Sequence, residues 1–308
     1  NLESSVSKDI KLKYLNITKT RNAFYTIFKQ IKMIKPDIVY SSLNRTNILI
    51  LMVKLFYPFF KVVIREPSIP SVQIKQNYMS SSMLFLIRFL YHWATKIIAQ
   101  TKYMKKEIED IYKVDEKKVI AINNPLDKKN IENSLQDKIN PFANYQENFN
   151  FVYVGRLSDE KNPLFLVNVF EKVVKEDDRF HLCIIGDGNL KKDIESIIKE
   201  KSLQDNISLL GFQKNPYPYI KYADGLLLSS KWEGMPNVVI ESLYLNTLVI
   251  TTNSTPILKD LIVDGYNGYI VDDFDSNEFS QNILNFKDIH NEFKKVNDFD
   301  FNKFFENV

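Results

Sequence analysis

The sequence contains few of the residues on which disulfide-linked and zinc-dependent proteins rely. Its single cysteine, Cys183, excludes a disulfide framework and indicates a reducing compartment. This residue lies in the apolar run HLCIIG, which is typical of a buried structural thiol. The three histidines, His92, His181 and His290, lie far apart and lack the spacing of zinc ligands. The sequence therefore predicts no metal site.

Long apolar runs are also lacking. The two most apolar segments, 47–64 and 83–99, are both interrupted by charged residues or a proline. Neither supplies the roughly twenty uninterrupted apolar residues that a membrane-spanning helix needs. Segment 83–99 is expected to form a core helix, and docking onto a bilayer surface is the alternative.

The first half of the chain contains no glycine. All eight glycines lie in the second half, at positions 155, 186, 188, 211, 225, 234, 265 and 268. In α/β folds a ligand that approaches the backbone at the carboxyl ends of strands usually needs glycine there. A nucleotide-like ligand is therefore expected in the second half.

Charge is unevenly distributed along the chain. Residues 1–140 hold 24 Lys and Arg against 12 Asp and Glu, which leaves 17 and 26 of the chain's 41 and 38 for the remainder. The basic half predicts contact with anionic lipid or a phosphate-bearing acceptor. A lysine-rich solvated surface is the alternative. No nucleic-acid partner is expected.

Short apolar strands alternate with helical segments throughout, which predicts parallel sheets built from βαβ units. In the first half the strands are expected at 36–42, 60–66, 95–101 and 117–125, and the helices at 22–34, 47–57, 83–93 and 102–112. The polar stretch 126–150 is the best candidate for a linker, after which the pattern restarts. The expected domains are 1–140, 141–285 and a helical tail, 286–308, that packs back on the first domain.

Two carboxylates flank a predicted helix start in SSKWEGMPNVVIESLYLN: Glu233 precedes Pro236, and Glu241 follows it. Pro236 suits the first helical position. Three amides at the helix start are expected to be unpaired and to form an anion site: those of Asn237, Val238 and Val239. Carboxylates accept hydrogen bonds from sugar hydroxyls well. This spacing predicts a nucleotide-sugar, with one sugar ring on each glutamate, and the alternative is a pair of acids that complement the helix dipole.

Two cations, Arg156 and Lys161, follow a strand that ends at Gly155 in VGRLSDEKNP. Paired cations at this place suit a diphosphate leaving group, although surface salt bridges with Asp159 and Glu160 are the alternative. Two further strand exits, IIGDG and LLGF, contribute Gly186, Gly188, Gly211 and Phe212, and the second could meet a flat base. The acidic pair in 273–275 is expected to be a loop.

Together these motifs resemble retaining glycosyltransferase family 4, also described as glycosyl transferases group 1. The pieces GRLSDEKNP, IIGDG, LLGF, the segment 222–253 and DGYNGYIV occur in the family's order and cover about residues 150–272. The specific element is Glu233 to Glu241, a Glu-x7-Glu. The first half matches more loosely.

The resemblance implies an α/β chain with the GT-B fold, in which two Rossmann-like doubly wound domains face a central cleft. Arg156 and Lys161 would hold the donor diphosphate, Glu241 the ribose hydroxyls, and Glu233 the transferred sugar. The donor site would also include Gly155, Gly186, Gly188, Gly211, Phe212, Gly234, Met235, Pro236, Asn237 and Val238. Transfer would retain the anomeric configuration without a metal or other cofactor.

Two departures from the family matter. The family opens with a strand and a glycine-rich loop, whereas nothing before KLKYLNI supplies them here, so the first domain is expected to be incomplete by about one βαβ unit. Many members carry a histidine after the strand that corresponds to KVVI, whereas Arg65 and Glu66 stand here. These two residues are expected on the acceptor side, and a buried ion pair is the alternative.

The resemblance therefore predicts transfer from a UDP-sugar to a bacterial surface glycan, either an oligosaccharide or a polyprenyl-diphosphate-linked acceptor. The expected location is the cytoplasm, with peripheral contact at the inner face of the cytoplasmic membrane. One alternative is a nucleotide-sugar-binding remnant or subunit without turnover. The other is a GT-B nucleotide-sugar epimerase, which would need more acid/base histidines than this chain has.

Overall fold

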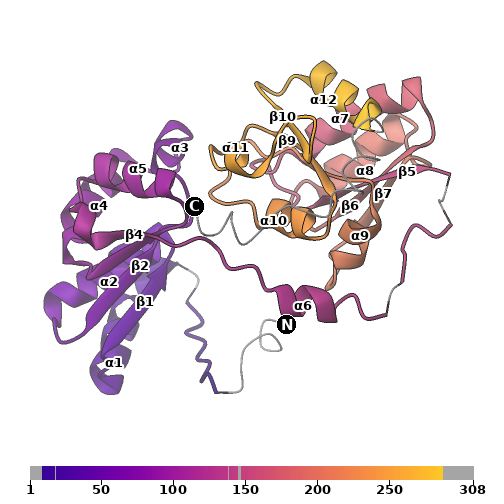
Figure 1. The fold of residues 1–308 in the computed structure, drawn as a ribbon. Helices are drawn as coiled ribbons and strands as arrows, with labels where there is room; N and C mark the ends of the chain where they lie inside the picture. The colour runs from indigo at the N-terminus through magenta and orange to yellow at the C-terminus, as the bar shows by residue number, and fades with distance from the viewer. Residues whose placement is uncertain (1–8, 18, 138, 145–146, 287–308) are drawn as a thin grey trace. The chain divides into compact units, whose positions relative to one another are not determined.

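The computed structural model describes residues 9–17, 19–137, 139–144 and 147–286. The chain divides into two compact units, Asn1–Ile122 and Asn123–Val308. Each unit is built on its own parallel sheet, which confirms the predicted α/β class (Figure 1).

The first unit contains a four-stranded sheet in the order β1-β2-β3-β4, with every neighbouring pair parallel. Its strands are β1 (Ile38–Ser42), β2 (Lys61–Arg65), β3 (Lys96–Ala99) and β4 (Val119–Ala121). Each lies inside its predicted range. Buried β-branched residues such as Val62, Ile64 and Ile97 alternate with more exposed ones, so helices cover the sheet and keep these side chains from water.

Five α-helices connect and cover these strands: α1 (Phe24–Ile34), α2 (Asn44–Phe56), α3 (Pro70–Lys75), α4 (Ser81–Leu90) and α5 (Lys102–Tyr112). The side chains of Ser80 and Thr101 accept hydrogen bonds from the amides of Met83 and Met104, so both residues act as N-caps for α4 and α5. Short 3₁₀ helices also lie in this unit, at Thr20–Ala23, Tyr91–Trp93 and Glu116–Lys118. Helix α3 was not predicted.

The second unit contains a six-stranded parallel sheet in the order β10-β9-β8-β5-β6-β7. Its strands are β5 (Phe149–Val154), β6 (Phe180–Ile185), β7 (Ile207–Gly211), β8 (Gly225–Leu228), β9 (Leu248–Thr252) and β10 (Gly268–Val271). The chain builds β5, β6 and β7 in one direction and then returns to add β8 on the other side of β5. The strand order therefore reverses between β5 and β8.

Helices cover both faces of this sheet: α6 (Lys128–Asn133), α7 (Pro163–Glu176), α8 (Lys191–Glu200), α9 (Tyr217–Tyr222), α10 (Asn237–Tyr244), α11 (Leu258–Leu261) and α12 (Ser276–Leu284). Phe151 and Tyr153 of β5 point into a core shared with α7, α8 and α12, whereas Val152 points into a core shared with α9, α10 and α11. Because successive side chains of β5 point to opposite faces of the sheet, each face has its own hydrophobic core.

The division between the units lies earlier in the chain than the expected boundary after residue 140. Within the expected linker, Ile131 of α6 and Phe142 are both buried in a core of the second unit. The hydroxyl of Tyr244 also donates a hydrogen bond of 2.6 Å to Glu132. Of the expected tail 286–308, only Phe286 lies within the described residues, and it packs against Phe149 and Phe151 in the second unit.

Within the part of the chain that the structure describes, no helix combines the length and apolar character needed to cross a bilayer.

Candidate donor-binding site

The reversal of strand order marks the place in the second sheet where a ligand is expected. In open parallel sheets, the loops after two neighbouring strands diverge at such a point and leave a crevice at the carboxyl ends. Strands β5 and β8 flank this point, and they are followed by Gly155 and Ser229. Most of the predicted donor-site residues lie in these two loops or at the start of α10.

Two glycines allow the loop after β6 to pack against the loop after β5, backbone to backbone. A Cβ atom added to Gly186 would lie 1.8 Å from the carbonyl oxygen of Gly155, and one added to Gly188 would lie 2.3 Å from that of Leu157. Gly186 also has a φ of +148°, which disfavours other residues. These glycines set the path of both loops, and a direct contact with ligand stays a prediction for them.

At the centre of the site Lys161 and Glu233 form an ion pair. The Lys161 ammonium lies 2.5 Å from Oε1 of Glu233, and the Ser230 hydroxyl donates to the same oxygen over 2.7 Å. The two charged side chains are only 21% and 10% exposed. Residues 72 positions apart in the chain thus meet at the predicted place, so a cation from the β5 loop orients a carboxylate from the β8 loop.

Further hydrogen bonds hold this pair in place. The Ser229 hydroxyl donates to the backbone oxygens of Lys161 and Asn162 over 3.0 and 2.9 Å. The amide of Glu233 donates to the carbonyl oxygen of Ser254 over 3.0 Å. Loops after β5, β8 and β9 are thereby joined, and the geometry of the ion pair is preorganised.

Arg156 occupies a more exposed position. Its guanidinium lies 3.2 Å from the Glu160 carboxylate, and its side chain is 68% exposed. Nearby, the Lys231 ammonium lies 2.6 Å from Oδ1 of Asp159. The alternative of surface ion pairs therefore applies to Arg156, whereas Lys161 pairs with Glu233 instead of with Asp159 or Glu160. An exposed pair of this kind contributes little to stability, so Arg156 can change partner at low cost.

Helix α10 begins one residue later than expected, because Pro236 is its N-cap and Asn237 its first residue. The prediction of three unpaired amides at this helix start is wrong for Val239, whose amide donates to the carbonyl oxygen of Pro236 over 3.1 Å. A tightened first turn satisfies this donor. Met235 is buried beside the helix start, and the side chain of Asn237 accepts a hydrogen bond of 2.7 Å from that of Asn124.

Glu241 lies in the second turn of α10 and is partly buried. Burial raises the pKa of its carboxyl group, and a hydrogen bond with the Tyr217 side chain partly offsets this shift. A carboxylate with few water contacts gains more from a hydroxyl donor than an exposed one does. Its position is suitable for the predicted contact with ribose.

Two buried hydroxyl groups were missed by sequence reasoning. The side-chain oxygens of Ser158 and Ser254 are enclosed and have no hydrogen-bond partner within the described residues. Ser158 follows β5 and Ser254 follows β9, so both belong to the loops around the ion pair. Buried hydroxyls without a partner are uncommon in folded proteins, so each of these two calls for an explanation such as a bound water. Serines in loops carry no sequence signal of such burial.

The remaining predicted donor-site residues lie at two loops. Phe212 directly follows β7 and is 75% exposed, and Gly211 before it has a φ of +67°. The carbonyl oxygen of Gly211 accepts a hydrogen bond of 2.9 Å from Gly186. Gly234 accepts a hydrogen bond of 3.3 Å from the Thr255 hydroxyl. A base contact at Phe212 stays a prediction.

No three His, Cys, Asp or Glu side chains within the described residues are grouped so that they could hold a metal ion. In the acidic segment 273–275, Asp275 is the N-cap of α12 and accepts hydrogen bonds from the amides of Asn277 and Glu278. This carboxylate therefore has a structural role.

A sequence profile described as glycosyl transferases group 1 matches residues 134–300. The chain belongs to this family.

The relatives include an uncharacterized glycosyltransferase of Methanocaldococcus jannaschii, which is 32% identical over 74% of this chain and 58% of its own length. The N-acetylgalactosamine-N,N'-diacetylbacillosaminyl-diphospho-undecaprenol 4-alpha-N-acetylgalactosaminyltransferase of Campylobacter jejuni is 31% identical over 80% of this chain and 66% of its own length. The chain thus spans about three fifths to two thirds of these two relatives.

Solved structures with low sequence identity have the same fold. HepE of Anabaena in complex with UDP superposes with a TM-score of 0.68 and 15% identity, over 87% of this chain and 74% of its own. Sucrose-phosphate synthase from Thermosynechococcus elongatus superposes with a TM-score of 0.74 and 14% identity, over 97% of this chain and 80% of its own. These likenesses confirm the predicted GT-B fold class for this family member.

Arg65 and Glu66, which stand where the family resemblance led us to expect a histidine, lie at the end of β2. Arg65 is half-buried, whereas the Glu66 side chain is fully enclosed in the first unit. Glu66 accepts hydrogen bonds from the Tyr91 hydroxyl and, over 3.1 Å, from Nδ2 of Asn47. Burial raises the pKa of Glu66 to about 7. An acceptor-side role stays a prediction for both residues, and Glu66 could act only through its neighbours.

The buried carboxyl group of Glu66 makes the stability of the first unit depend on pH. Because its pKa rises from 4.5 when exposed to about 7 when folded, the folded state binds more protons in this interval, and stability falls as pH rises through it. We expect the unfolding free energy of the wild type, relative to Glu66→Gln, to fall by about 3 kcal/mol from pH 4.5 to 7 and then to level off. Denaturant titrations at several pH values measure this difference.

The chain has two tryptophans, Trp93 in the first unit and Trp232 in the second. If Trp232 is replaced by phenylalanine in both the wild type and Glu66→Gln, the fluorescence of Trp93 follows the unfolding of the first unit alone. The difference in unfolding free energy between the proteins with and without Glu66→Gln removes the contribution of the other acidic groups, which titrate in both. Equal pH dependence of the two unfolding curves would show that Glu66 is not held protonated by burial.

Proposed function

We propose that this protein transfers a sugar from a UDP-sugar to a surface-glycan acceptor, with retention of configuration and without a metal ion. The observation that carries the proposal is the enclosed Lys161–Glu233 pair at the reversal of strand order. A cation and a carboxylate fixed side by side can bind a diphosphate and a sugar hydroxyl, which are the two groups that meet in a nucleotide-sugar.

The donor would lie across the start of α10. Lys161 and Arg156 would contact the diphosphate, and Glu233 would accept hydrogen bonds from the transferred sugar. Glu241, about one helical turn into α10, would accept those of the ribose. Arg156 is exposed and can move from Glu160 to the phosphate, so it is suited to close over a bound donor.

In the proposed reaction the bond between the anomeric carbon and the diphosphate oxygen breaks as the acceptor oxygen bonds to the same face of that carbon. The acceptor proton passes to the departing phosphate oxygen. Lys161 and Arg156 stabilise the negative charge that develops there, which is the usual task of preorganised cations in group transfer. No side-chain nucleophile takes part.

The names of similar proteins support the choice of donor and acceptor. The HepE structure contains UDP, and the Campylobacter relative is named for transfer to an undecaprenol-diphosphate-linked sugar. A capsular polysaccharide biosynthesis glycosyltransferase of Staphylococcus aureus is also similar, with 28% identity over 65% of this chain. We therefore propose an acceptor that is a lipid-linked or polysaccharide glycan.

Binding of a nucleotide-sugar without turnover is the second candidate. The Lys161–Glu233 pair would hold a donor in either case. Release of UDP from a UDP-sugar, measured with and without a glycan acceptor, separates the two candidates.

The donor site is tested by titrating UDP into the purified chain in the presence of EDTA. We expect binding that weakens about tenfold or more in Lys161→Ala and in Glu241→Ala, because each change removes a charge-assisted hydrogen bond to the ligand. Isothermal titration calorimetry measures both the affinity and the stoichiometry.

Lys192→Ala and Glu195→Ala on the exposed face of α8 are matched controls and should bind UDP as the wild type does. Wild-type affinity in both site variants would place the donor elsewhere. Binding that EDTA abolishes and magnesium restores would contradict the metal-free proposal.

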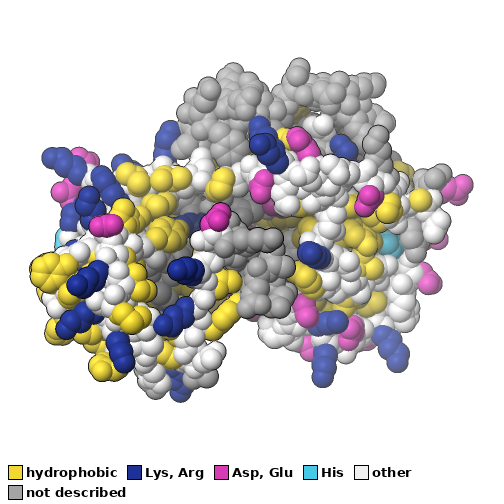
Figure 2. Space-filling model, turned by 90° about the horizontal axis from the view of Figure 1, so that it is seen from below, with side chains coloured by type: hydrophobic (Ala, Val, Ile, Leu, Met, Phe, Trp, Pro, Cys, Tyr) yellow, Lys and Arg dark blue, Asp and Glu magenta, His cyan; other side chains and the backbone are white. Residues whose placement is uncertain are grey.

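We also propose that the first unit docks on the anionic inner face of the cytoplasmic membrane. Residues 1–122 contain 21 Lys and Arg against 9 Asp and Glu. On α4 and the following 3₁₀ helix, Phe85, Phe89 and Trp93 are 70%, 56% and 48% exposed at intervals of four residues. Figure 2 shows basic and apolar side chains interspersed over the face of this unit that it displays. Exposed aromatic rings flanked by cations suit the lipid interface.

Several basic residues border this aromatic face. Lys118 donates a hydrogen bond to the backbone oxygen of His92, in the 3₁₀ helix that carries Trp93, and Lys96 donates to that of the neighbouring Lys117. The acidic residues nearby in sequence are Asp115 and Glu116. We expect the chain to cosediment with vesicles that contain phosphatidylglycerol and much less with phosphatidylcholine alone.

Phe85→Ser with Phe89→Ser should reduce this cosedimentation strongly, and Lys96→Ala should weaken it by about 1 kcal/mol. Phe212→Ser is the control, because Phe212 is also a largely exposed phenylalanine but lies in the second unit. Equal binding to both kinds of vesicle, or no effect of the paired serine changes, would contradict membrane docking by this face.

A further inference from the structure

A cavity of about 700 Å³ lies in the first unit, and every described residue that lines it belongs to that unit. It runs along one side of α2, whose lining residues Arg45, Ile48, Leu49 and Met52 recur at the spacing of a single helix face. From Arg45 to Met52 this face is about 10 Å long. The volume is in the range of ordinary small-molecule sites.

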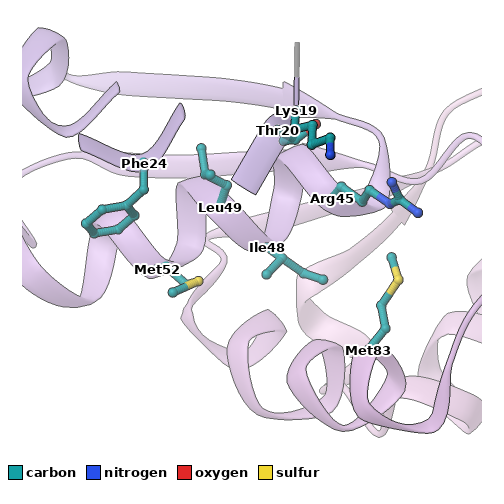
Figure 3. Close-up of a pocket in the computed structure, with 8 residues that line it drawn as sticks. All are labelled: Lys19, Thr20, Phe24, Arg45, Ile48, Leu49, Met52 and Met83. Carbon is teal, nitrogen blue, oxygen red and sulfur yellow. The ribbon is translucent and has the colours of Figure 1, made fainter. Parts of the chain in front are cut away.

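The two ends of the cavity differ in chemistry (Figure 3). Lys19, Thr20 and Arg45 lie towards one end, where Met83 is also drawn, and Phe24 and Met52 lie at the other. No acidic residue is among the described residues that line it. The charge and polarity of the lining residues therefore match a ligand with an anionic head and an apolar chain.

The two cations at the polar end have no side-chain partner within the described residues. Neither the Lys19 ammonium nor the Arg45 guanidinium takes part in a hydrogen bond or ion pair there, and both side chains are exposed. Arg45 also stands in the first turn of α2, where the helix dipole disfavours a cation. That helix start has no capping side chain and no acidic residue in its first turn. A bound anion would offset both unfavourable features.

The apolar end continues beyond the cavity. The ring of Phe24 contacts that of Phe56 edge-on with centroids 5.9 Å apart, and Phe56 is 70% exposed. A hydrocarbon chain longer than the cavity could therefore leave along these rings. Met83 lines the cavity from α4, the helix that also carries the exposed Phe85 and Phe89.

We propose that this cavity binds an amphiphile that consists of a hydrocarbon chain with a phosphate or diphosphate head group. The head lies between Lys19 and Arg45, and the chain lies along Ile48 and Met52 towards Phe24. Arginine and lysine together suit such a head, because one provides a planar fork and the other a point charge. That this amphiphile is the lipid carrier of the acceptor rests on the proposed function, whereas the binding itself does not.

Calorimetric titrations with farnesyl diphosphate, farnesol and inorganic diphosphate test the proposal on the full chain. We expect one farnesyl diphosphate per chain, with an affinity at least about tenfold above that of either part alone. Arg45→Ala and Met52→Gln should each weaken this binding about tenfold, and Lys106→Ala, an exposed lysine of α5 outside the cavity, should not.

The stability of Arg45→Ala provides a second readout. Because this arginine opposes the helix dipole, its removal should leave the melting temperature of the ligand-free chain unchanged or higher while binding is lost. A variant that both binds poorly and melts earlier would mean that Arg45 has a structural role and would overturn its assignment to the ligand. Met52 is exposed, so its replacement leaves the core intact.

A short-chain phosphatidylglycerol, used as monomer, distinguishes the two sources of such a head group. Tighter binding of farnesyl diphosphate supports a prenyl carrier, and tighter binding of the phospholipid supports a membrane lipid in the same cavity. Inorganic diphosphate that binds as tightly as farnesyl diphosphate, or affinity that neither variant lowers, would overturn the proposal. Binding of UDP by the same preparation is scored separately, so failure here and failure of the donor site are distinct results.

Discussion

The reversal of strand order between β5 and β8 is the constraint on which the second unit's site depends. It brings two loops that are far apart in the chain to the same edge of the sheet, and each contributes one member of the Lys161–Glu233 pair. Hydrogen bonds from Ser229 and Ser230 then fix the pair in a partly enclosed place. An ion pair buried to this extent is costly unless its remaining polar groups are satisfied, and Ser230 provides one such bond to Glu233, whereas Ser229 holds the backbone that carries Lys161.

The first unit uses buried polar groups differently. Glu66 is enclosed at the end of β2 with Tyr91 and Asn47, so its carboxyl group meets these side chains instead of solvent. The groups available to ligands are instead the cations Lys19 and Arg45 beside an apolar cavity. A donor site with a fixed ion pair in one unit and an amphiphilic cavity in the other would together suit transfer of a sugar to a lipid-linked acceptor.

Much of this arrangement could be predicted from local pattern. Strands rich in β-branched residues and glycines at strand ends predicted the sheets, and the Glu-x7-Glu element predicted which loops form the candidate donor site, because each has a strong local cause. Long-range packing was less accessible. The burial of Ile131 and Phe142 in the second unit, the tightened turn that satisfies the Val239 amide, and the enclosed hydroxyls of Ser158 and Ser254 depend on contacts between distant segments.

Hydrogen exchange with and without UDP, in EDTA and resolved by peptide, tests the central claim most directly. If the donor binds at the reversal of strand order, UDP should slow exchange in residues 155–161 and 229–241 and leave α8 unchanged. Slower exchange confined to other segments, with these two loops unaffected at saturating UDP, would contradict the account.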